Sequence, residues 1–122
     1  MKPDCTITHV EIPAPDLNAA SAFYAAVFDW KIEVIIENSY SFFIIGDTNT
    51  GGGLDASLKP AEKGVGTQLV INVDDINHYL ERIVTAGGTI TQTKTPIGSG
   101  EHGYFAAFKD PNGNHLQIHC ER

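Results

Sequence analysis

Two residues near the start of the chain carry side chains suited to metal or proton chemistry. His9 and Glu11 stand two positions apart in TITHVEI (residues 6–12), where apolar residues alternate with period two and predict a β-strand. Side chains two positions apart leave the same face of a strand, so an imidazole and a carboxylate are expected side by side. Imidazoles bind metal ions and carboxylates move protons. Two interpretations of His9 stay open: a metal ligand, or a pocket-wall histidine that hydrogen-bonds its neighbours.

Two later stretches repeat this separation of polar and apolar faces. TQLVINV (67–73) and NHLQIHC (114–120) each predict a strand with one apolar face, suited to packing on a helix. Polar side chains occupy the opposite face of each stretch. They are Gln68 and Asn72 in the first stretch, and Gln117 and His119, beside His115, in the second.

The first half of the chain reads as strand, helix and three strands. Asp16 is placed to cap a helix over about 17–29, and Pro13 and Pro15 are expected to end the preceding strand. The three strands that follow are predicted at 31–37, 40–46 and 50–58.

The second half repeats this order after a polar connector at 59–66. Asp75 caps a second helix that stops at Gly87-Gly88. Three strands follow at 89–95, 104–109 and 114–120, the last two joined by the turn DPNG. An offset of 59 residues superposes His9 on Gln68 and Asp16 on Asp75, which indicates an internal repeat. The pattern predicts one α+β domain over 1–122, built from two βαβββ modules at about 5–58 and 67–120.

Composition excludes several classes of partner. The chain has 122 residues, 42% of them hydrophobic, and a net charge of −7. Such acidity disfavours nucleic-acid binding, and the absence of a long apolar run disfavours membrane insertion. The first ten residues lack the apolar core of a signal peptide, so a cytoplasmic location is expected.

Three stretches, taken in order, resemble one known superfamily. They are HVEIPAPDLNAASAFYAAVFDW near the start, AGGTI in the second half and FKDPNGNHLQI near the end. Together they resemble the vicinal oxygen chelate superfamily of glyoxalase I, bleomycin-resistance proteins and extradiol dioxygenases. The resemblance implies a cup-shaped mixed sheet with helices on the convex face, a small organic ligand on the concave face, and a homodimer.

The same resemblance implies positions for a metal ion. They fall at His9, within Gly52–Asp55, at Gln68 and at Gln117, for one divalent ion (Ni, Zn, Fe or Mn). Carboxamide oxygens are weak ligands for these ions, so a site without metal stays open as an alternative.

The expected pocket combines the polar faces of these strands. Its predicted lining is His9, Glu11, Gln68, Asn72, Gln117 and His119. With a metal bound, the protein would be a lyase or isomerase of the glyoxalase type in which Glu11 moves a proton; a dioxygenase is less favoured. Without one, it would sequester a drug or metabolite as bleomycin-resistance proteins do. Tyr40 and Phe42 share a strand face and are expected in the core or along an apolar side of the pocket.

Overall fold

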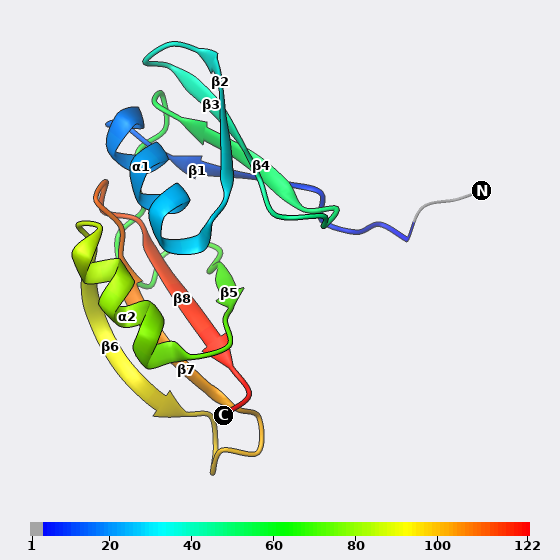
Figure 1. Ribbon diagram of the computed structural model, residues 1–122, viewed down its shortest axis with the longest axis vertical. Coiled ribbons are helices and arrows are strands. Elements are labelled where there is room, and N and C mark those ends of the chain that lie inside the picture. The colour runs from blue at the N-terminus through cyan, green and yellow to red at the C-terminus, as the bar shows by residue number, and fades with distance from the viewer. Residues whose placement is uncertain (1–3) are drawn as a thin grey trace. The chain divides into compact units, whose positions relative to one another are not determined.

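A computed structural model describes residues 4–122 as two compact units, the first ending at Lys59 and the second beginning at Pro60. Each unit contains one helix and one four-stranded sheet (Figure 1). The first unit comprises β1 (His9–Pro13), α1 (Leu17–Phe28), β2 (Lys31–Ile36), β3 (Tyr40–Ile44) and β4 (Gly51–Asp55). The second comprises β5 (Val70–Asn72), α2 (Ile76–Thr85), β6 (Thr89–Pro96), β7 (Tyr104–Lys109) and β8 (His115–Cys120). The predicted α+β class with two βαβββ modules is therefore confirmed.

The two sheets have the same strand order. In the first it is β1-β4-β3-β2, with β1 and β4 parallel and the other pairs antiparallel. In the second it is β5-β8-β7-β6, with β5 and β8 parallel. Each strand of one unit thus has a counterpart in the other, as the repeat of 59 residues predicts.

Helix α1 packs against the sheet of its own unit through an apolar stripe that includes Phe23, Tyr24 and Val27, all buried. The Tyr24 ring stacks on Trp30 at 5.1 Å, and Trp30 stacks on Phe43 of β3 at 4.5 Å between ring centroids. Burial of such large rings is a major source of stabilisation in a small unit. This aromatic layer fixes which face of the first sheet is covered by the helix.

Both helices begin at the predicted aspartate caps. Asp16 accepts a hydrogen bond from the Ala19 amide at 3.0 Å, and Asp75 accepts one from the His78 amide at 3.2 Å. Each carboxylate satisfies one of the first amides of its helix, which have no partner within the helix itself.

Helix α2 lies along β6, β7 and β8 and ends at the predicted glycines (Figure 1). The Gly88 amide donates to the Ile83 carbonyl at 2.8 Å, and the Gly87 amide to the Val84 carbonyl at 3.1 Å. Gly87 has φ +101°, the left-handed conformation that this pair of hydrogen bonds requires at a helix end.

The predicted turn between β7 and β8 is built around Asp110, which is buried together with Asn114. One carboxylate oxygen of Asp110 accepts from the Asn112 and Asn114 amides at 2.9 Å each, and the other accepts from Asn114 Nδ2 at 2.8 Å. The turn therefore sets the register in which β8 returns beside β7.

Several strands are shorter than predicted. Strand β1 begins at His9 instead of residue 6 and ends at Pro13, which pairs with Asp55, and the Ala14 amide donates to the Asp55 carbonyl at 2.9 Å. Strands β2, β3 and β4 end at Ile36, Ile44 and Asp55, before the predicted ends at residues 37, 46 and 58. Strand β5 has three residues instead of the predicted 67–73, so Gln68 lies before it. The β5–β8 ladder begins at the pair Val70 and Gln117, and just before it the Leu69 carbonyl accepts a hydrogen bond from the Gln117 amide at 3.0 Å.

No helix within residues 4–122 is long and apolar enough to cross a membrane.

Candidate functional site

The sheet face of the first unit opposite the buried Ile12 and Phe43 carries the polar side chains of β1, and we call it the first open face. Strand pairing places Glu11, Gly53 and Phe42 in one row across β1, β4 and β3. Residues paired across neighbouring strands project to the same side, so this row belongs to one face. The face also carries His9, Tyr40, Ile44 and Asp55.

His9 and Glu11 lie side by side, as their spacing predicts. His9 Nε2 and the Tyr40 hydroxyl both contact the same carboxylate oxygen of Glu11, and Tyr40 donates to it at 2.7 Å. The side chains of His9 and Glu11 are 48% and 36% exposed. The carboxylate is therefore held in one orientation yet stays accessible to a ligand.

The missing side chain of Gly53 makes room for this arrangement. A Cβ atom at position 53 would overlap the Tyr40 hydroxyl and the Glu11 carboxylate. Gly53 is itself buried beneath them. Glycine is the residue that lets the phenol reach across β4 to the carboxylate on β1.

The contact of Tyr40 with Glu11 is not expected from the sequence, whose pattern indicates only core or an apolar pocket wall for Tyr40. Partial burial, then the hydrogen bond and the charge of Glu11, and finally the charge of Asp55 raise the pKa of Tyr40 to about 12. The phenol therefore keeps its proton at neutral pH and acts as a donor. The sequence feature that could have indicated the contact between Tyr40 and Glu11 is the glycine run 51–53, which lies in β4 between β1 and β3.

Phe42 supplies an apolar wall next to these polar groups. Its ring meets His9 edge-on at 6.3 Å and Tyr40 edge-on at 5.4 Å between centroids. It is 39% exposed, unlike its neighbour Phe43, which is buried. The first open face therefore presents an exposed aromatic surface beside the held carboxylate.

The second unit carries the remaining predicted residues on the corresponding sheet face, which we call the second open face. His119 Nε2 donates to the His102 carbonyl at 3.0 Å, and its Nδ1 lies 3.3 Å from Asn72 Oδ1. The structure thus brings Asn72 and His119 together as predicted. The His102 carbonyl occupies Nε2 of His119. A ligand could hydrogen-bond this nitrogen only by displacing the loop that contains His102.

Gln117 projects from the same face of β8 as His119, and Gln68 meets it farther along the strand, toward His115. Both glutamines line a hollow of about 300 Å³ together with Lys63 and Thr91. Gln68 does so from the segment before β5, whereas Gln117 projects from the middle of β8.

Strand register identifies the residue at the implied metal position on β4. Glu11 pairs with Gly53, and Val70, its equivalent 59 residues later, pairs with Gln117. Gly53 is therefore the counterpart of Gln117 and has no side chain to offer. Asp55, the counterpart of His119, instead accepts hydrogen bonds from the Ser57 amide and hydroxyl at 2.8 and 2.7 Å. These bonds, the hydroxyl's first, lower the pKa of Asp55.

The remaining donors do not fit a divalent transition metal. Since Gly53 has no side chain, the metal ligands that the family resemblance implies are one imidazole, from His9, and two neutral carboxamides, from Gln68 and Gln117. Such ions prefer imidazole, thiolate or carboxylate ligands. Among residues 4–122, no three histidine, cysteine, aspartate or glutamate side chains gather as such a site would require.

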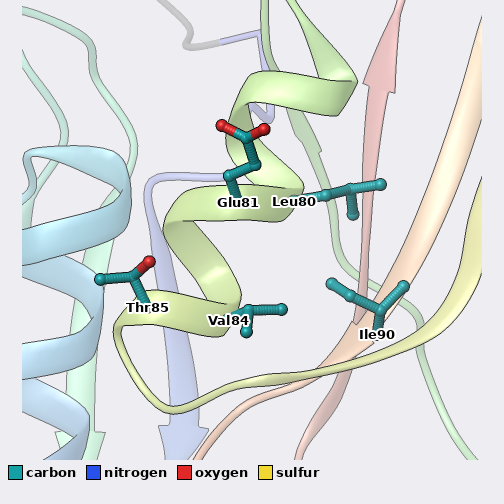
Figure 2. Close-up of a pocket in the computed structure, with 5 residues that line it drawn as sticks. All are labelled: Leu80, Glu81, Val84, Thr85 and Ile90. Atoms are coloured by element: carbon teal, nitrogen blue, oxygen red, sulfur yellow. The ribbon is translucent and has the colours of Figure 1, made fainter.

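Another hollow, of about 560 Å³, lies between α2 and the start of β6 and has an apolar character. Figure 2 shows Leu80, Val84 and Ile90 gathered on one side, while Glu81 and Thr85 point away from them. None of the predicted site residues lines it, and its polar groups do not converge.

Comparisons with known proteins agree with this architecture. Residues 6–118 match the family described as Glyoxalase/Bleomycin resistance protein/Dioxygenase superfamily. A glyoxylase-like domain-containing protein from Didymella fabae is 31% identical over 123 residues, covering 95% of this chain and 93% of that protein.

Solved structures share the fold at lower identity. A glyoxalase/bleomycin resistance protein/dioxygenase family enzyme from Burkholderia phytofirmans PsJN has a TM-score of 0.76 and 21% identity, over 94% of this chain and 98% of that one. A mutant of the fosfomycin resistance protein FosX from Listeria monocytogenes, solved with Mn(II) and a dihydroxypropylphosphonic acid, has a TM-score of 0.76 and 18% identity, over 94% and 89%. Since the family match spans nearly the whole chain, the protein belongs to the glyoxalase/bleomycin resistance protein/dioxygenase superfamily.

Proposed function

We propose that this protein binds a small organic molecule without a divalent metal ion, as the bleomycin-resistance branch of the family does. The observation that carries the proposal is the Glu11 carboxylate, held by His9 and Tyr40 and open to solvent beside Phe42. This arrangement offers a ligand a fixed hydrogen-bond acceptor and an aromatic surface.

Each unit has its own proposed contacts. In the first unit Glu11 accepts a hydrogen bond or a proton from a ligand, His9 and Tyr40 orient the Glu11 carboxylate, and Phe42 packs against an apolar part of the ligand. In the second unit Gln68, Asn72, Gln117 and His119 are the proposed contacts. A preformed acceptor lowers the ordering cost of binding, because the carboxylate need not be reoriented.

The decisive experiment is a thermal-shift titration with and without metal. Bleomycin and a panel of small organic compounds are added to purified protein, each in the presence and absence of EDTA. A melting temperature that rises by several degrees at saturating ligand, unchanged by EDTA, supports the proposal. Glu11→Gln and His9→Ala should weaken the response, whereas Glu33→Gln, which alters a carboxylate in the same row at the far edge of the sheet, should not.

The competing function, a metal-assisted lyase or isomerase, is favoured by the manganese-bound FosX structure of the same fold. It requires stoichiometric Ni, Zn, Fe or Mn in purified protein and a thermal shift with these ions that His9→Ala abolishes. That pair of results would overturn the metal-free proposal.

A homodimer and a cytoplasmic location stay predictions. Exposed apolar side chains along the edge strand β2 support self-association, with Val34 63% and Ile36 58% exposed. Light scattering coupled to size exclusion measures it directly, against a chain mass of 13.2 kDa.

A further inference from the structure

The hollow of about 300 Å³ in the second unit is lined by Gln68 and Gln117, and the proposed function does not say which chemical group they bind. It lies between the segment that precedes β5 and strands β6, β7 and β8. Its side chains include Lys63, Gln68, Thr91, Ala107, His115 and Gln117. Its volume is at the lower end of the range typical of small-molecule sites.

The segment before β5 is shaped to bring Lys63 to this hollow. Gly64 and Gly66 have φ near +80°, and the Val65 amide donates to the Glu62 carbonyl at 3.1 Å, closing a turn around Lys63. Glycine takes these left-handed conformations without strain. Both glycines also line the hollow, so the backbone approaches it closely here.

The strands provide space and a hydroxyl. Ala107 stands in the row between Gln117 and Gln92, and its small side chain leaves depth in the middle of the sheet. The β6 ladder shifts register between Ile90 and Gln92, so Thr91 is the extra residue of a bulge. Bulges redirect side chains, which accounts for a β6 hydroxyl at this site.

The lining is rich in hydrogen-bond donors and carries a positive charge. The Lys63 ammonium, the amide groups of Gln68 and Gln117 and the Thr91 hydroxyl can all donate. No carboxylate is among the described residues that line the hollow. In a chain of net charge −7, an ammonium group among neutral donors is a local exception that favours an anion.

We propose that this hollow binds the anionic oxygen group of a small organic ligand, a carboxylate or a phosphoryl group. Lys63 supplies the charge, and Gln68, Gln117 and Thr91 supply hydrogen bonds. The inference rests on the proposed function, since it names the chemical class of the group that the second unit's proposed contacts would bind.

The test uses succinate and methylphosphonate as probes, each titrated into the ¹⁵N-labelled protein and followed by amide chemical shifts. Expected are saturable shifts of Gly64, Gly66 and the side-chain amides of Gln68 and Gln117, weakened by added NaCl. The probe that binds more tightly identifies the anionic group as carboxylate or phosphoryl.

Matched variants test whether the positive charge that binds the anion is the Lys63 ammonium. Lys63→Gln should weaken binding of the better probe about tenfold or more, because an exposed charge-assisted contact is lost. Lys63→Arg should largely retain it. Lys59→Gln, which removes a charge from the preceding unit without touching the hollow, should leave it unchanged.

Two outcomes overturn the inference. One is equal binding by the wild type and Lys63→Gln. The other is the absence of saturable shifts with both probes while an organic ligand still raises the melting temperature in a Glu11-dependent way, which leaves the proposed function standing. Failure of that function has a different signature, namely no EDTA-insensitive response to any organic compound.

Discussion

Gly53 lies directly beneath the Tyr40 hydroxyl, so a side chain at position 53 and the hydrogen bond from Tyr40 to Glu11 exclude each other. The bond joins β3 to β1 across the strand that separates them. Its two ends are 29 residues apart in the sequence.

Tyr40→Phe should change how stability depends on alkaline pH. The folded-state pKa of Tyr40 is about 12 against an ordinary value of 10.0, so the folded protein keeps a proton that the unfolded chain loses between these values. Wild-type unfolding free energy should therefore fall from pH 10 to 12 relative to the variant. Urea unfolding at stepped pH measures this difference. Tyr104→Phe, in the second unit, is the control, and parallel pH profiles for wild type and Tyr40→Phe would contradict the assignment.

Gly53→Ala and Gly52→Ala should differ sharply although they are neighbours. At position 53 the added methyl displaces only the ends of the Tyr40 and Glu11 side chains, costing about 1–3 kcal/mol. At position 52 it meets the Val10 backbone carbonyl and lies 2.6 Å from the Phe43 ring, which cannot move away, so the loss should exceed about 3 kcal/mol. Chemical denaturation compares the two variants, and equal losses would show that the β4 backbone itself adjusts.

Asp16→Ala and Asp75→Ala should each destabilise the protein by about 1 kcal/mol. Both remove the carboxylate that accepts the third amide after the cap, from Ala19 and His78 respectively. Serine at either position should recover most of the loss, because its hydroxyl can accept the same bond. Unfolding followed by circular dichroism measures the effect; no loss for either alanine variant would contradict the capping role.

Asp110→Ala should cost more than either cap, about 2–4 kcal/mol, because it leaves two backbone amides of a buried turn without their acceptor. Asp110→Asn is the informative comparison. Its amide oxygen can still accept from Asn112 and Asn114, but its amino group faces Asn114 Nδ2, so an intermediate loss is expected. An asparagine variant as unstable as the alanine variant would indicate that charge, not turn geometry, dominates at Asp110.

The strand faces and the helix caps are predicted correctly from the sequence, because they depend on local sequence pattern. Period-two alternation correctly separates Ile12 from Glu11 and Phe43 from Phe42, and the two aspartate caps fall where the helices begin. These features depend on residues a few positions apart, which the chain order itself displays.

What the sequence cannot display is pairing between distant strands. The approach of Tyr40 to Glu11 depends on β4 lying between β1 and β3 and on a glycine at the crossing point. Likewise β5 is shorter than its residue types favour: only Val70–Asn72 pair with β8, although β8 itself begins at His115. Strand propensity alone therefore does not fix the length of a strand.

The alternation of faces in each unit has a consequence for how such a protein can diversify. Residues such as Ile12 and Ile118 face a helix and are constrained by packing, whereas Glu11 and Gln117, their sequence neighbours, are not. Substitution of exposed side chains on the open side, unlike that of the buried Gly53, therefore carries little risk of unfolding. Because the chain holds this scaffold twice, recognition chemistry in one half can be replaced while the other half is unchanged, a form of modularity that favours the evolution of new ligand specificities.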